Sequence, residues 1–205
     1  VEVYPEHDLG DDAALDQFVN EVRGLAPRAT GASVYMFEAS RTIMASLQQA
    51  LGTAVILVAL IVFTLWRSLP DTVRVLVPLL LAGASTGALS VFAGLSINFA
   101  DVIVVPLLLG IGVDSGIHLV HRHRDHRAGG APPETGLLDT STPRAILWSA
   151  MTTIASFGSL AFATHLGMAS LGQLLTLGVV VTVAANLIIL PALLALDGSA
   201  NGREP

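Results

Sequence analysis

The sequence contains no cysteine and no lysine, and few of its residues carry a charge. The lack of cysteine excludes disulfide bridges and thiolate metal sites. Charged residues make up 13% of the chain, whereas a soluble domain usually has about 25%. The net charge of −6 gives no indication of nucleic-acid binding. We therefore expect no nucleic acid, metal or cofactor among the partners of this chain.

Long apolar segments stand where charges are missing. No Asp, Glu, Lys or Arg occurs within residues 42–66, 75–100 or 145–196. A helix needs roughly 20 mostly apolar residues to cross a bilayer, so each run can cross once and the last can cross twice. The runs and the turn residues between them therefore predict five transmembrane helices. Their expected ranges are 40–66, 72–95, 99–122, 143–164 and 170–196.

The two ends of the chain differ from its middle. Residues 1–39 are polar, and they predict two short strands, Val1–Tyr4 and Ala32–Phe37, on either side of a helix at Asp11–Arg23. We interpret them as a short α/β remnant of a periplasmic domain, too small to be stable alone. Residues 197–205 are expected to be a disordered tail. The predicted fold is an all-α membrane bundle of five helices that follows this remnant. Because no signal peptide precedes the first residue, we expect a fragment of a longer protein.

Arginine placement predicts the orientation of the bundle. Arginines occur in the first and third connections between the predicted helices, and the second and fourth connections have none. Positive charges favour the cytoplasmic side, so these two connections are expected in the cytoplasm. The remnant then lies in the periplasm and the C-terminus in the cytoplasm, which predicts a multi-pass protein of the bacterial inner membrane. The arginines concerned are Arg67, Arg74, Arg122, Arg124, Arg127 and Arg144.

One acidic residue, Asp114, falls inside a predicted transmembrane helix. At 1.5 Å per residue it lies about 20 Å from Asp101 and about 12 Å from Arg122. A carboxylate at that depth costs at least a few kcal/mol, so it should face protein or water. Because burial disfavours its charged form, such a group could take up a proton on one side of the membrane and release it on the other. The alternative is a structural acid that is neutral or hydrogen-bonded within the bundle.

Glycines surround Asp114 on the same helix. Gly112 and Gly116 form a small-xxx-small pair, which lets a neighbouring helix approach closely. We assign Gly110 to the same packing surface. Close packing of this kind would also bring a hydrogen-bonding partner near the acid.

Two histidines and a row of hydroxyl groups are further candidates. His118 and His121 lie four and seven residues beyond Asp114, on roughly its face. They could line a proton path to the cytoplasm, because histidine titrates near neutral pH, or they could be interfacial residues. Ser149, Thr152, Ser156 and Ser159 recur every three or four residues. This polar stripe could hydrogen-bond Asp114 from a neighbouring helix or form a packing seam.

Two catalytic patterns are present but in the wrong context. Gly83–Gly87 matches the G-x-S-x-G pattern of a nucleophile elbow, which needs a strand–turn–helix and here lies inside an apolar helix. Gly110–Asp114 is similar to the Gly-x-Gly-Asp motif of intramembrane aspartyl proteases. Val113 interrupts that motif, and no other predicted transmembrane helix has a central acid. We therefore expect a protein that is not an enzyme.

Several segments resemble the MMPL-type transporters of the RND superfamily. The sequence from Gly110 to Arg124, GIGVDSGIHLVHRHR, resembles the signature of their tenth transmembrane helix. Thr152–Phe162 and Ala185–Leu194 are similar to their eleventh and twelfth helices, and Val3–Glu6 with the helix after it resembles the end of their second periplasmic domain. Asn98–Gly110 is most similar to the hopanoid-biosynthesis-associated branch.

This resemblance implies a proton-driven lipid exporter of twelve helices in two repeats. The five helices here would be the eighth to twelfth, and the first repeat would be a missing partner. Membrane lipids, including hopanoids, and protons are the other implied partners. Assembly into a homo-oligomer is a further possibility. The proton-carrying acids of the family lie on the fourth and tenth helices, and Asp114 matches the second of these.

The resemblance also extends the list of relay residues. Many members have Tyr directly after the acid, where this sequence has Ser115. With Ser115 in place of that tyrosine, the residues expected to form the proton relay are Asp114, Ser115, His118, Thr152, Thr153 and Ser156. The same bundle also resembles sterol-sensing domains, so a membrane sensor or scaffold that does not transport is the alternative. Asp114 favours transport, because a scaffold needs no buried acid.

Overall fold

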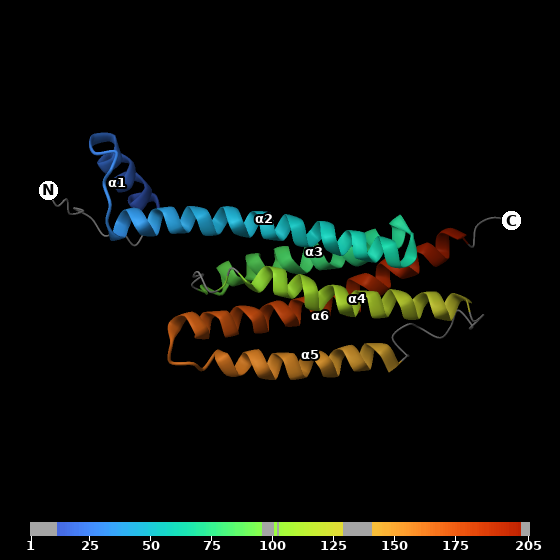
Figure 1. Ribbon diagram of the computed structural model, residues 1–205. Coiled ribbons are helices and arrows are strands. Elements are labelled where there is room, and N and C mark those ends of the chain that lie inside the picture. The colour runs from blue at the N-terminus through green and yellow to red at the C-terminus, as the bar shows by residue number, and fades with distance from the viewer. Residues whose placement is uncertain (1–11, 96–100, 102, 129–140, 202–205) are drawn as a thin grey trace. The chain divides into compact units, whose positions relative to one another are not determined.

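The computed structural model describes residues 12–95, 101, 103–128 and 141–201, and the regular elements of these ranges are six helices. The chain divides into two compact units, residues 1–49 and 50–205, with α2 contributing to both. Figure 1 labels the helices in chain order. Their bounds are α1 Asp12–Leu25, α2 Ala32–Trp66, α3 Leu69–Phe92, α4 Val104–Ala128, α5 Ser141–Leu160 and α6 Leu166–Asn201.

The first unit is a pair of helices, α1 and the beginning of α2. Val34 and Phe37 are three residues apart, so a helix places them on one face, and both are buried against α1. The strand predicted at Ala32–Phe37 is therefore wrong, and the α/β remnant is not confirmed. The strand predicted at Val1–Tyr4 lies outside the described residues. The apolar side chains buried in this unit are Leu15, Val19, Val34 and Phe37.

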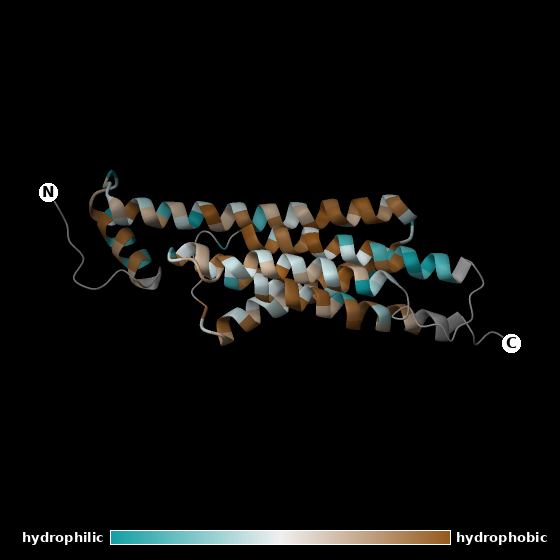
Figure 2. Ribbon diagram, turned by 90° about the horizontal axis from the view of Figure 1, so that it is seen from below, coloured by the Kyte–Doolittle hydropathy of each residue, from teal (hydrophilic) through white to brown (hydrophobic). Residues whose placement is uncertain are grey.

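The second unit is a bundle in which α6 packs against α3, α4 and α5, and α3 also packs against α4. The end of α2 contributes Val62 to its core. Figure 2 shows the apolar character of the helices and the hydrophilic C-terminal end of α4. The most deeply buried apolar side chains of this unit are Val62, Val75, Val104, Leu119, Val120, Leu175, Val179 and Leu190.

Four of the described helices are long and apolar enough to cross a membrane, namely α2, α3, α4 and α6. They correspond to the segments predicted at 40–66, 72–95, 99–122 and 170–196. Helix α5 is not among them, because its 20 residues include many serines and threonines as well as Arg144. The prediction of five transmembrane helices is therefore not confirmed by length and composition.

Several helix ends differ from the predicted ones. Helix α2 begins at Ala32 instead of residue 40, because no proline or glycine separates the two positions. Helix α4 continues to Ala128, six residues beyond the predicted end at 122. Helix α6 continues to Asn201, beyond the predicted end at 196, and residues 202–205 lie outside the described ranges.

A tight turn joins α2 to α3. Arg67 adopts a left-handed backbone conformation with φ of 49°, and its N–H donates to the Phe63 carbonyl at 2.6 Å. Ser68 then caps α3 by accepting a hydrogen bond from the Asp71 N–H at 3.4 Å. This geometry places Asp71 in the first turn of α3, where the helix dipole favours an acid.

Candidate functional site

Asp114 lies near the middle of α4, as predicted, but the other described helices do not cover its side chain. Its side chain is 76% exposed, whereas Gly112 and Gly116, two residues away on either side, are buried. Asp114 Oδ1 lies 3.6 Å from His118 Nε2, one helical turn further on. Helix α4 therefore has a packed face and an uncovered face, and the acid is on the uncovered one.

The uncovered face continues toward the C-terminal end of α4. His121 Nε2 lies 3.7 Å from Asp125 Oδ2, and these side chains are 64% and 55% exposed. Asp125 was not a predicted site residue, because the predicted helix ended at residue 122. Its spacing of four residues from His121 is the signal that could have indicated it.

The glycines of α4 do not all contribute to packing. A Cβ on Gly112 would collide with Leu79 Cδ1 and lie 2.7 Å from Thr182 Cγ2. A Cβ on Gly116 would lie 3.1 Å from Val75 Cγ1, so the small-xxx-small pair does face neighbouring helices. Among the described residues, none lies within 4 Å of a Cβ on Gly110, so this glycine is not part of the surface that packs against the described helices.

A buried amide links α6 to α4 at the same level. Asn186 is 1% exposed, and its Nδ2 donates to the Gly112 carbonyl at 2.8 Å. The sequence analysis missed this residue, although an asparagine within an apolar helix is a recognisable signal. The bond joins the two helices through the backbone of a residue that packs closely against both α3 and α6.

The hydroxyl groups of α5 are bonded within their own helix. Thr152 and Thr153 both donate to the Ser149 carbonyl, at 2.7 and 3.0 Å, and Ser156 donates to the Thr152 carbonyl at 2.8 Å. Ser115 of α4 donates likewise to Ile111, at 3.4 Å. These bonds are all local, so they do not join the polar stripe to Asp114.

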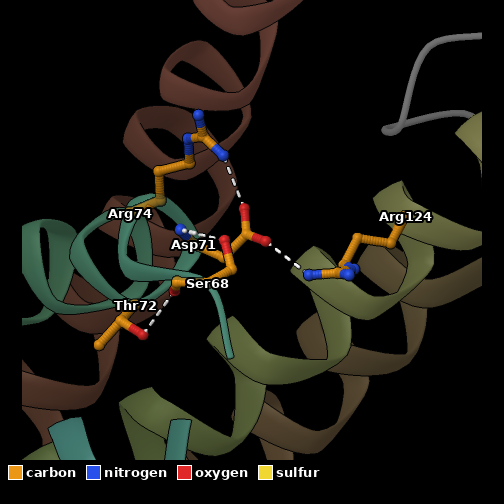
Figure 3. A network of polar contacts seen from close by, with 5 residues as sticks. All are labelled: Ser68, Asp71, Thr72, Arg74 and Arg124. Atoms are coloured by element: carbon orange, nitrogen blue, oxygen red, sulfur yellow. Dashed lines mark hydrogen bonds and ion pairs between the residues drawn. The ribbon is translucent and has the colours of Figure 1, made fainter. Parts of the chain in front are cut away.

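An ionic cluster joins the N-terminal end of α3 to the C-terminal part of α4 (Figure 3). Asp71 Oδ1 accepts from Arg74 Nη1 at 2.6 Å, and Asp71 Oδ2 accepts from Arg124 Nη1 at 2.7 Å. The Asp71 side chain is only 12% exposed. In the sequence analysis both arginines served only to assign the orientation of the bundle. The ion pair between Asp71 and Arg124 joins residues 53 positions apart, and such a contact depends on how the helices pack.

A second buried acid lies at the other end of the bundle. Asp101 is 4% exposed, and Ser170 Oγ donates to its carboxylate, 3.2 and 3.3 Å from the two oxygens. This contact connects the residues before α4 to the first turns of α6. Among the described residues, no three histidine or acidic side chains converge as metal ligands would.

Comparison with known proteins identifies relatives over most of the chain. The MMPL family model matches residues 10–205. The chain is 39% identical over 95% of its length to the hopanoid transporter HpnN of Rhodopseudomonas palustris, and 35% identical over 91% to that of Burkholderia multivorans. It is also 31% identical over 74% of its length to a putative membrane protein, MJ1562, of Methanocaldococcus jannaschii, of which it covers 39%.

The chain spans only 22% and 20% of the two hopanoid transporters. The apolar helices and these relatives identify a multi-pass membrane protein. Because the family model covers nearly the whole chain, the protein belongs to the MMPL family of the RND superfamily.

Proposed function

We propose that this chain is part of an RND-type exporter that uses the proton gradient to move hydrophobic lipids, such as hopanoids, out of the inner membrane. Asp114 is the group that takes up and releases the proton. The observation that carries the proposal is an exposed carboxyl group halfway along a helix long enough to span the membrane. The named hopanoid transporters among the relatives support the choice of substrate.

The depth of Asp114 makes an uncovered position costly. At 1.5 Å per residue it lies about 15 Å from the beginning of α4 and about 21 Å from its end. A charged side chain at the centre of a helix in lipid costs roughly 2.5–3.5 kcal/mol or more. Protein or water must therefore cover this face of α4. In our proposal the cover is the first repeat of the transporter.

Hydroxyl groups near Asp114 complete the proposed relay. Ser115, Thr152, Thr153 and Ser156 each donate to a helix carbonyl. Each hydroxyl oxygen keeps lone pairs that can accept a proton donor or hold a water molecule. We propose that closure of the first repeat over α4 and α5 brings these groups into one hydrogen-bonded network with Asp114.

The proposal includes five crossings and a cytoplasmic C-terminus. Helix α5 has 20 residues, about 30 Å of helix, which matches the thickness of the hydrocarbon core. Its hydroxyls are internally hydrogen-bonded, which lowers the cost of placing them in lipid. It packs along α6, and a Cβ on Gly172 would lie 2.7 Å from the Leu160 carbonyl carbon. The arginine-bearing connections face the cytoplasm.

The test is export of a hopanoid by the full-length transporter carrying Asp114→Asn. Asparagine keeps the size of the side chain and removes its titratable proton, so export should fall by roughly 10²-fold or more, as when a positioned proton-transfer group is lost. Asp114→Glu should retain part of the activity. Asp16→Asn, on the exposed face of α1, is the control for loss of an acid.

Membrane expression and detergent extraction of each variant must match the parent protein. Unchanged export with Asp114→Asn would falsify the proton-carrying role. The sensor or scaffold function would then explain the bundle better, because it needs no titrating group.

A further inference from the structure

One face of α4 carries a row of four titratable side chains. Asp114, His118, His121 and Asp125 are separated by four, three and four residues, and side chains at these spacings are neighbours on a helix surface. The outer pairs are in contact, at 3.6 Å between Asp114 and His118 and 3.7 Å between His121 and Asp125. All four side chains are more than half exposed, so the row lies along the uncovered face of the helix.

The charged groups around this row come from α4 itself and from the helices packed against it. On α4, Arg122 is exposed directly after His121, and Arg124, directly before Asp125, is held by Asp71 at 2.7 Å. Helix α3 contributes Asp71 and Arg74, which bind one another, and α5 contributes Arg144 in its first turn. The described side chains of α6 include no ionisable group. Asp125 is therefore left to interact with His121 instead of with the arginine beside it.

The chemistry of the row suits stepwise proton transfer. A neutral imidazole accepts a proton at one ring nitrogen, and an imidazolium can donate from the other. A proton that leaves the Asp114 carboxyl group for His118 makes a carboxylate and an imidazolium. Transfer to His121 and then to the Asp125 carboxylate restores both histidines, and Asp125 releases the proton to water. The separations of 3.6 and 3.7 Å both exceed a hydrogen bond, so a bridging water or a rotamer change completes each of these transfers.

We propose that His118, His121 and Asp125 form the route by which protons travel between Asp114 and the arginine-bearing end of α4. The route rests on the proposed function of Asp114, and it extends that function over three helical turns to the surface. If the row only stabilised the helix, loss of either acid–histidine pair would leave proton movement unchanged.

The experiment uses the full-length transporter reconstituted in bacterial phospholipid vesicles that contain a hopanoid and a pH-sensitive dye. Proton flux under an imposed pH gradient is measured from pH 5 to 8, where histidine ordinarily titrates. His121→Gln and Asp125→Asn should each reduce the flux by roughly tenfold or more and flatten its pH profile. Asp125→Glu, which retains a carboxyl group, should restore most of the flux.

The controls separate this route from the function on which it rests. His165→Gln removes an exposed histidine from the connection between α5 and α6, at the opposite end of the bundle, and should leave the flux unchanged. If Asp114→Asn abolishes flux but the His121 and Asp125 variants behave as the parent, the route is wrong and the proton-carrying function of Asp114 stands. If Asp114→Asn leaves the flux intact, both proposals are overturned.

Discussion

Gly112 and Gly110 provide a matched test of how α4 packs. Both glycines lie in the same turn region of the same helix, and replacing either by alanine adds one methyl group. At Gly112 the new Cβ would collide with Leu79 and approach Thr182 Cγ2 to 2.7 Å. At Gly110 it would meet no atom of the described part of the chain within 4 Å. The two substitutions therefore differ only in whether a neighbouring helix is present.

The expected difference follows from two opposing terms. Alanine is favoured over glycine in a helix by about 0.5–1 kcal/mol, and this gain applies equally to both variants. Adding a methyl group to a filled space costs about 1–3 kcal/mol. Leu79 can rotate its terminal methyl groups away, whereas the β-branched Thr182 is stiff at χ1. We expect Gly112→Ala to be less stable than Gly110→Ala by about 2 kcal/mol.

The measurement is unfolding of this chain in mixed micelles by sodium dodecyl sulfate, followed by the fluorescence of its two tryptophans, of which Trp66 packs against the core of the second unit. Gly110→Ala should unfold at the same or a higher detergent fraction than the parent protein. Gly116→Ala should fall between the two, because its Cβ would lie 3.1 Å from Val75. Equal stability of the Gly110 and Gly112 variants would refute the close approach of α3 and α6 to α4.

Two further substitutions test contacts between helices by the same unfolding measurement. Asn186→Leu removes the amide that donates to the Gly112 carbonyl and should cost about 1 kcal/mol; stability equal to the parent would mean that α6 does not approach α4 there. Asp71→Asn leaves Arg74 and Arg124 without their shared carboxylate. It should cost about 2 kcal/mol, less than the 3–5 kcal/mol of a fully buried pair, because Arg124 is 43% exposed. Independence of this loss from salt concentration would argue against an ionic contact.

Hydropathy predicted the helices well because the signal is continuous along the chain. The charge-free runs cover most of α2, α3 and α6, and α3 begins at a polar turn at Ser68. The prediction was wrong where a local pattern was short. The six apolar and small residues at Ala32–Phe37 are compatible with a strand or a helix. A helix is favoured because it places Val34 and Phe37 on one face, where both are buried against α1.

The candidate site was predictable in part. The sequence located Asp114 within a predicted transmembrane helix and the small pair Gly112 and Gly116 on a packing surface. In the structure Asp114 lies within α4, which is long and apolar enough to cross a membrane, and both glycines face neighbouring helices. Gly110 was grouped with them because spacing alone does not reveal which face of α4 meets a neighbour. The same limit concealed the bond between Asn186 and Gly112, since contacts between distant segments depend on the packing of whole helices.

The polar groups of α4 and α5 differ in how much they require a covering partner. The hydroxyls of α5 donate to carbonyls of their own helix, so lipid around them leaves no donor unsatisfied. The Asp114 carboxylate cannot accept a hydrogen bond from its own helix backbone in the same way, because N–H groups at mid-helix are already bonded to carbonyls. Its near neighbour His118 is itself exposed. A carboxyl group in this position is stable in a membrane only when protonated, hydrated or covered. The face of α4 that carries Asp114, rather than the serine and threonine stripe of α5, therefore sets where the proposed first repeat must dock.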